Sequence, residues 1–193
     1  MINRRNLSLA LVGILILVIV VGSFFNSDED SFTIEAMDIQ RPNHLDLLFQ
    51  SHGGVTYRHY GSSVSMYLVQ YRRDEQVFHE LVTGIARADA YAFSGSAIWG
   101  VTREGMKPHE LRASVTINGS MGQSYIDLSA LDFDFSAIAT SAALVDNQRI
   151  ESGERYVLHI WQSGGGFRAD GNVFAPEQLR ESEHTLILYL IFD

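Results

Sequence analysis

The hydrophobic positions at the start of the chain form one uninterrupted run. Residues 7–25 carry no charge, and 14 of these 19 residues are Leu, Ile, Val or Phe. As a helix rising about 1.5 Å per residue, the run would be about 28 Å long, close to the roughly 30 Å hydrocarbon core of a bilayer. The run has no polar face, which disfavours a helix lying on the membrane surface. The pattern therefore predicts a transmembrane helix that contacts the lipid bilayer.

Charges on either side of this run predict its orientation. Arg4 and Arg5 precede it, and the acidic residues 28–30 follow it. Positive charge remains on the cytoplasmic side, so the N-terminus is expected inside the cell and the rest of the chain outside. The predicted parts are a cytoplasmic N-terminus (1–6), a transmembrane signal anchor (7–25), a linker (26–31) and an extracellular or periplasmic domain (32–193).

The same run has an alternative interpretation as a cleaved signal peptide. The small residues 21–23 resemble a cleavage site. The apolar run, however, is longer than the 7–15 residues usual for the hydrophobic part of a signal peptide. The pattern favours a retained anchor, and cleavage would instead give a secreted protein. Both interpretations export the same domain.

After Phe32 the pattern changes to an alternation of period two, which is typical of β-strands. Residues 111–118 alternate almost perfectly, with Leu111, Ala113, Val115 and Ile117 on one face. Two further strand-like runs, 64–71 and 77–85, flank a polar segment and predict a hairpin. The run 184–192 is apolar on both faces, which predicts a central strand.

Residues typical of turns separate about eight or nine predicted strands. Gly95 and Gly100 predict a bend, a bulge or two short strands, and residues 119–123 predict a turn. Residues 176–183 predict one helical turn. The pattern predicts a mainly β domain, an antiparallel β-sandwich of Ig-like or jelly-roll-like form with short helical turns at most. A closed barrel is the alternative.

Composition and charge exclude several classes of functional site and of binding partner. The 193 residues carry a formal charge of −9 and include no Cys, which excludes disulfides, thiolate metal sites and thiol nucleophiles. Without Arg4 and Arg5, 12 basic residues face 23 acidic ones, so the exported part carries −11. This charge argues against nucleic acid, anionic membrane surfaces and polyanionic polymers as partners. We expect no cofactor.

Three carboxylates are the weak candidates for metal binding or acid–base chemistry. Asp132 and Asp134 would share one side of a strand, with Asp127 nearby. Close carboxylates bind calcium or act as an acid–base couple, but no glycine-bearing calcium loop accompanies them. Neither a G-x-S-x-G nor an H-E-x-x-H motif is present. The simpler interpretation is that the three aspartates are solvent-facing acids and form no metal site.

Aromatic side chains are the other candidates, because exposed rings can stack against sugars. Residues 57–60 lie between glycines and form the cluster most expected to be exposed. Strand aromatics are nonetheless more often core or cross-strand pairs. The predicted binding residues are Tyr57, His59, Tyr60, Trp99 and Trp161, and the wider set of possible platform residues adds Tyr67, Tyr71 and Tyr125.

These observations favour a non-enzymatic function. We expect a membrane-anchored binding or accessory module at the cell envelope, with a protein or glycan partner. The alternatives are a small carbohydrate- or cell-wall-active enzyme that uses the three aspartates, and a structural subunit of a membrane complex.

Overall fold

A computed structural model describes residues 32–37, 49–102, 109–135, 138–142, 148–165 and 172–193. The predicted cytoplasmic N-terminus, membrane helix and linker, residues 1–31, lie outside the described residues. Within the described part, no helix is both long enough and apolar enough to cross a membrane.

The described chain is mainly antiparallel β-sheet, as predicted. Helix is confined to two short segments, and the one at residues 176–179 confirms the helical turn expected there. The elements are β1 (Thr33–Ala36), β2 (Phe49–Arg72), β3 (Glu75–Thr102), β4 (Glu110–Ile117), β5 (Ser120–Asp127), η1 (Leu128–Ala130), β6 (Ile138–Ala142), β7 (Gln148–Arg149), β8 (Arg155–Ser163), α3 (Pro176–Leu179) and β9 (His184–Phe192).

Two unusually long strands organise the sheet. β2 and β3 form the predicted hairpin and pair from Arg72 opposite Glu75 to Phe49 opposite Thr102. β3 is one continuous strand through Gly95 and Gly100, where a bend or two short strands were among the expectations. The other side of β2 pairs with β1 near its start and with β9 near its end.

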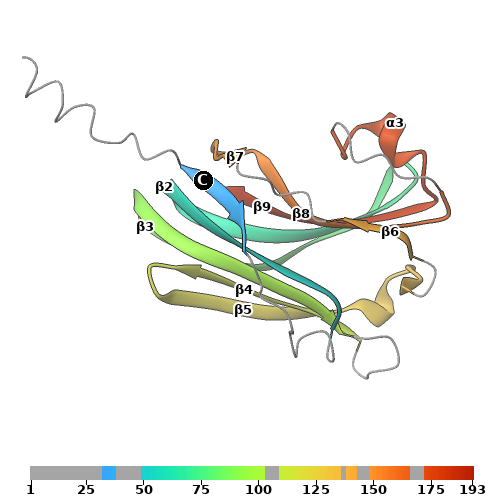
Figure 1. Cartoon of the computed structure of the whole chain (residues 1–193), viewed down its shortest axis with the longest axis horizontal. Helices are drawn as coiled ribbons and strands as arrows, with labels where there is room; N and C mark the ends of the chain where they lie inside the picture. The colour runs from blue at the N-terminus through green and yellow to red at the C-terminus, as the bar shows by residue number, and fades with distance from the viewer. Residues whose placement is uncertain (1–31, 38–48, 103–108, 136–137, 143–147, 166–171) are drawn as a thin grey trace, which may run out of the picture. The chain divides into compact units, whose positions relative to one another are not determined.

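The described strands form one sheet in the order β5-β4-β3-β2-β9-β8-β6, with β1 and β7 attached through β2 (Figure 1). Two separate sheets, as in the predicted Ig-like or jelly-roll sandwich, are not seen among these strands. The physical reason is that β2 is long enough to pair with β1 near its start and with β9 near its end, while β3 pairs along its other side. A register shift between Gly61 and Ser63 lets β2 change direction without losing its pairing.

A tight Asn-Gly turn joins β4 to β5. Asn118 has φ 45° and Gly119 has φ 82°, the left-handed conformations that a two-residue hairpin requires. The prediction of a turn over residues 119–123 was therefore wrong, because residues from Ser120 onward already belong to β5. The shorter turn extends the paired surface of β4 and β5 by four residues of β5, from Ser120 to Gln123.

The core lies on the inner face of the sheet. Leu111, Val115 and Ile117 of β4 are fully buried, which confirms the alternation predicted for that strand. β9 lies between β2 and β8, which confirms its predicted central position. Its outer face joins a second, smaller core cluster that includes Val173 and Leu179, so the 172–179 segment packs against the sheet from outside.

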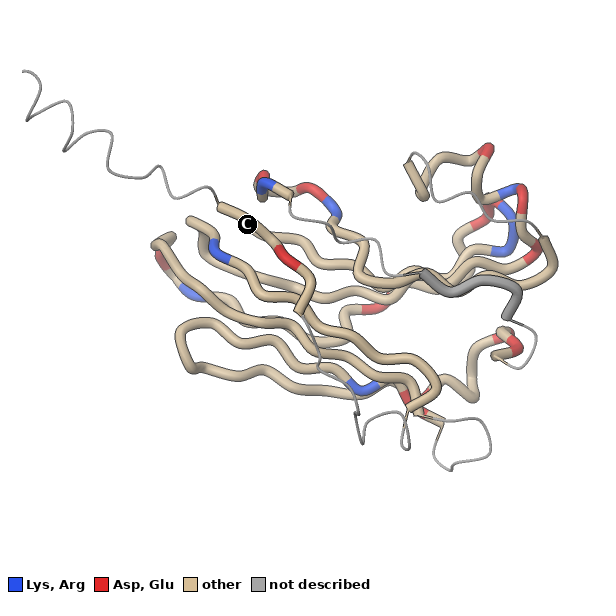
Figure 2. The backbone as a smooth tube through the Cα atoms, viewed as in Figure 1, with Lys and Arg blue, Asp and Glu red and all other residues tan. Residues whose placement is uncertain are grey.

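Charged residues are sparse along the strands and gather in the turns and connections (Figure 2). Glu110 and Arg112 are among the charged residues that do lie within a strand, β4. These two residues are part of the groove described next.

Candidate functional site

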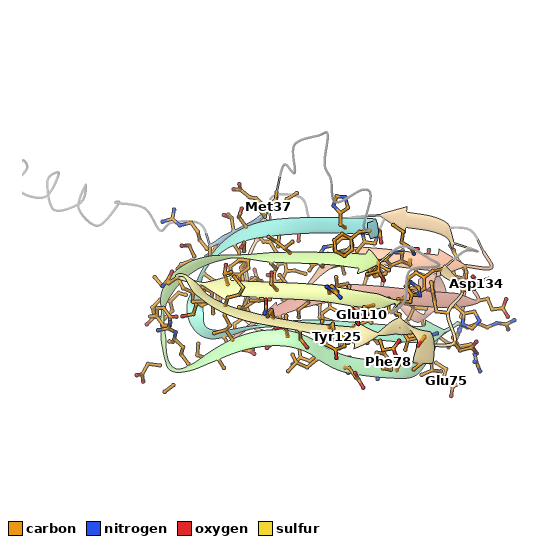
Figure 3. The ribbon with its side chains drawn as sticks, turned by 90° about the horizontal axis from the view of Figure 1, so that it is seen from below. Met37, Glu75, Phe78, Glu110, Tyr125 and Asp134 are labelled. Atoms are coloured by element: carbon orange, nitrogen blue, oxygen red, sulfur yellow. The ribbon has the colours of Figure 1, made fainter. Side chains whose placement is uncertain are left out.

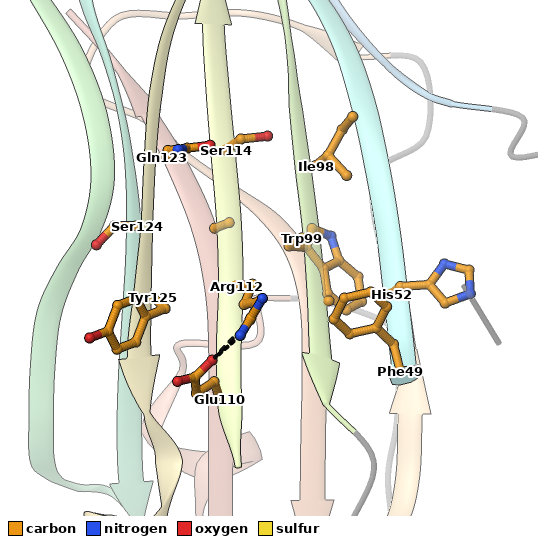
Figure 4. Close-up of a pocket in the computed structure, with 12 residues that line it drawn as sticks. Phe49, His52, Ile98, Trp99, Glu110, Arg112, Ser114, Gln123, Ser124 and Tyr125 are labelled. Carbon is orange, nitrogen blue, oxygen red and sulfur yellow. Dashed lines mark hydrogen bonds and ion pairs between the residues drawn. The ribbon is translucent and has the colours of Figure 1, made fainter. Parts of the chain in front are cut away.

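A shallow groove of about 780 Å³ lies on the outer face of β2, β3, β4 and β5 (Figure 4). Strand register aligns its side chains in rows across the sheet. Gly100 of β3 is opposite Arg112 of β4, which is opposite Tyr125 of β5. One step along, Ile98, Ser114 and Gln123 form a second row. The full lining is Phe49, His52, Ile98, Trp99, Gly100, Glu110, Arg112, Ala113, Ser114, Gln123, Ser124 and Tyr125.

The alternation of β4 explains why polar groups gather here. Because Leu111 and Ala113 turn into the core, Arg112 and Ser114 must point to the opposite face. β5 repeats this arrangement, with Gln123 and Tyr125 both exposed. The groove is therefore a product of the same pattern that builds the core.

An ion pair occupies the floor of the groove. Arg112 donates from Nε to Glu110 Oε2 at 2.9 Å, and its Nη2 lies 2.8 Å from the same oxygen. The Glu110 side chain is 8% exposed, whereas that of Arg112 is 61% exposed. The Glu110 backbone N–H also donates to Thr102 Oγ1 at 2.8 Å. The carboxylate is thus held in place, and its charge is compensated by a guanidinium that still faces solvent.

Aromatic side chains flank this ion pair. Tyr125 is 64% exposed on one side, and Phe49 lies on the other side against Gly100. Figure 4 shows Arg112 between these two rings, and Figure 3 shows Glu110 and Tyr125 near each other on the sheet. The exposed Ile98 side chain adds an apolar patch beside them.

The structure does not gather the five predicted binding residues on one exposed surface. Tyr57, Trp99 and Trp161 are at most 3% exposed and belong to the core. Trp99 and Trp161 pack edge to face with ring centroids 5.7 Å apart, and Trp99 also borders the groove. Tyr60 is 56% exposed but is not part of the groove lining.

His59 is also buried, because alternate residues of β2 face the core. Its ring packs against Phe93 and Phe192 at centroid distances of 5.6 Å and 5.3 Å. Burial lowers the pKa of His59, and the nearby charge of Asp193 partly opposes this shift. Residues 57–60 therefore alternate between core and solvent instead of forming one exposed cluster.

The three candidate aspartates serve other contacts. Asp127 accepts hydrogen bonds from the hydroxyl and the backbone N–H of Ser129, and these bonds lower the pKa of Asp127. Asp132 pairs with Arg72. Asp132 and Asp134 lie outside the strands, so the prediction that they share a strand face was wrong. Within the described residues, no group of three His, Asp or Glu side chains has the geometry to hold a metal ion.

Sequence reasoning included Tyr125 in its wider aromatic set but missed Phe49, Arg112 and Gln123. The available signal was the polar half of the β4 alternation, which includes Arg112 and Ser114. The Asn-Gly pair would have placed Gln123 and Tyr125 on the strand that pairs with it. In comparisons with known proteins, no family model, no curated protein and no solved structure matches this chain.

Proposed function

We propose that this protein is a non-enzymatic recognition module at the cell envelope. Residues 7–25 anchor it in the membrane, and the domain from Phe32 onward lies outside the cytoplasm. Its ligand binds in the outer groove of β2–β5. The observation that supports this proposal is the Glu110–Arg112 pair held between the exposed Tyr125 ring and the Phe49 ring.

This arrangement has the features of a binding site. Ligand sites combine apolar surface with a few polar groups in fixed positions. Here the hydrogen bond from Arg112 holds the Glu110 carboxylate before any ligand arrives, and the Glu110 backbone N–H is held by Thr102 Oγ1. This preorganisation reduces the ordering cost of binding. The side chains of Arg112 and Tyr125 remain accessible to a ligand.

The aspartates favour binding over the enzymatic alternative. A general acid at neutral pH needs a raised pKa, whereas the pKa of Asp127 is lowered by its bonds to Ser129. Asp132 is committed to an exposed ion pair with Arg72. These contacts favour a structural role for Asp127 and Asp132 in fixing the segment that follows β5.

The test compares two tyrosines of similar exposure. Full-length protein in a sugar-free detergent is immobilised, and retention of solubilised envelope material from the cells that produce it is measured. Tyr125→Ala should weaken retention at least about tenfold, equal to about 1.4 kcal/mol. Tyr60→Ala, which removes an exposed ring outside the groove, should leave retention unchanged.

Equal retention by the wild type and Tyr125→Ala would overturn the proposal, as would no retention by the wild type. Thermal unfolding of each variant separates loss of the contact from loss of the fold. If both tyrosine variants lose retention equally while remaining folded, the binding surface lies outside the groove.

A further inference from the structure

We infer that the ligand of this groove is an uncharged saccharide chain. The inference rests on the proposed function, since it names the chemical class that the same groove binds. It follows from the charges, the hydrogen-bonding groups and the backbone pairing of the lining strands.

The charges of the groove compensate each other. Glu110 is the carboxylate and Arg112 the guanidinium of its lining, which also includes His52, and Glu110 and Arg112 pair with each other at 2.8 Å. An anionic ligand would compete with Glu110 for Arg112 and would approach an exported part that carries −11. A cationic ligand would meet a carboxylate that is almost fully covered and already neutralised. A ligand of either charge would therefore lose hydration without gaining an unpaired group of opposite charge in the groove.

Hydroxyl groups match the polar groups that remain. Arg112 offers outward N–H donors, and Gln123 offers both an amide donor and an amide acceptor. The hydroxyl group of Ser114 donates and accepts in the same way. Tyr125 adds an exposed flat ring, which suits the apolar C–H face of a pyranose. A saccharide presents these same two features, a hydroxyl rim and an apolar face.

The backbone argues against an extended peptide as the ligand. Peptides that bind sheets by strand addition use the unpaired N–H and C=O groups of a strand edge. The groove lies instead on a face where β3 and β4 are each paired on both sides. A ligand on this face would be contacted by side chains and not by the backbone, which suits a ligand that is recognised through its hydroxyl groups.

The dimensions favour a chain of sugars over a single ring. The groove crosses four strands, and neighbouring strands are about 4.8 Å apart, so it spans roughly 14 Å from β2 to β5. Phe49 on β2 and Tyr125 on β5 stand at its two ends. Two separated aromatic rings can each contact a different sugar of one oligosaccharide.

The experiment fractionates the envelope material before binding. One pool is protease-treated polysaccharide that does not bind an anion exchanger, a second is the polysaccharide that does bind, and a third is membrane protein freed of glycan. Full-length protein in sugar-free detergent is tested against each pool, as wild type, Tyr125→Ala and Tyr60→Ala. The neutral polysaccharide should be retained, and Tyr125→Ala should reduce its retention at least tenfold.

The result separates failure of the inference from failure of the proposed function. Retention of anionic polysaccharide or of protein through Tyr125, without the neutral pool, would overturn the saccharide assignment and leave the groove as the binding site. Absence of Tyr125-dependent retention in every pool would overturn both. Neutral sugar analysis of the eluted material identifies the units bound in the positive case.

Discussion

The ring of Phe49 lies against the α-carbon of Gly100, so close that a Cβ at position 100 would stand 2.7 Å from Phe49 Cδ1. Gly100→Ala should therefore displace the Phe49 ring and alter one wall of the groove. We expect retention of envelope material to fall about fivefold, equal to about 1 kcal/mol. Quantitative retention on immobilised full-length protein measures this change.

Gly54→Ala is the matched control for this substitution. The Cβ at position 54 would stand 2.9 Å from Met37 Sδ, the far part of a flexible side chain, and 3.3 Å from the Ala97 carbonyl oxygen. Its distance of 3.5 Å from Ile98 Cγ1 is an ordinary van der Waals contact, and Gly54 is not part of the groove lining. Retention by Gly54→Ala should equal that of the wild type. Unchanged retention by Gly100→Ala would show that the Phe49 wall does not contact the ligand.

Acid should destabilise the domain through His159. This residue packs between Trp99 and Trp161, with both centroid distances 4.5 Å, and burial lowers the pKa of His159 from 6.5 to about 4. Between these two values the unfolded chain binds a proton that the folded chain excludes. Stability contributed by neutral His159 is therefore complete above about pH 6.5 and is lost as the pH falls toward 4, by about 3 kcal/mol.

Urea unfolding at pH 7 and pH 5, on wild type and His159→Phe, measures this dependence. His159→Phe should show a smaller loss of stability between the two pH values. Some loss should remain, because burial also lowers the pKa of His59. Identical pH dependence in the two proteins would exclude His159 as the source.

Gly95 should tolerate no side chain. A Cβ there would stand 1.8 Å from the carbonyl oxygen of Thr116 and 2.8 Å from Tyr57 Cε2. Gly95→Ala must separate β3 from β4, which we expect to cost about 3 kcal/mol. Gly119→Ala is the comparison. A Cβ at position 119 would meet no other atom, so the substitution should cost only the strain of a side chain at positive φ, about 1 kcal/mol. Chemical denaturation measures both, and equal losses would contradict the steric explanation.

The Tyr57 hydroxyl should contribute to stability from within the core. It donates to the Thr116 carbonyl oxygen at 2.7 Å, and its burial raises the pKa of Tyr57 because the charged form is disfavoured. Tyr57→Phe should lower the free energy of unfolding by about 1 kcal/mol. Tyr60→Phe, at an exposed position, should have almost no effect. No loss from Tyr57→Phe would show that the bond adds no net stability.

Protease added to intact cells should digest the domain if the predicted topology is correct. The positive-inside distribution around residues 7–25 predicts that residue 32 and those after it lie outside. An N-terminal epitope tag should remain cell-associated and protected if the segment is a retained anchor. Loss of the tag from mature protein would indicate cleavage, and full protection of the domain would contradict export.

Period-two alternation predicts a strand well where the strand has one buried face and one exposed face. β4 shows this directly, since Leu111 and Ala113 enter the core while Arg112 and Ser114 face solvent. The sheet topology was not predictable in the same way. Whether β2 continues past Gly61 into a second set of neighbours depends on pairing with β9, more than a hundred residues away.

The binding groove was only partly predictable for a related reason. Its members come from four strands, and only the cross-strand register brings Gly100, Arg112 and Tyr125 into one row. Tyr57 and Trp99 are aromatic residues like Tyr125, but their side chains are buried in the core. Residue type alone therefore could not separate core aromatics from the ring that faces solvent.

The position of β9 has a consequence for how the protein is made. β9 follows every other described strand along the chain, yet it fills the space between β2 and β8. Until His184–Phe192 has emerged from the ribosome or the export channel, the facing edges of β2 and β8 have no partner there. The domain should therefore complete its folding only after β9 has emerged, and until then these unpaired edges are exposed to wrong partners.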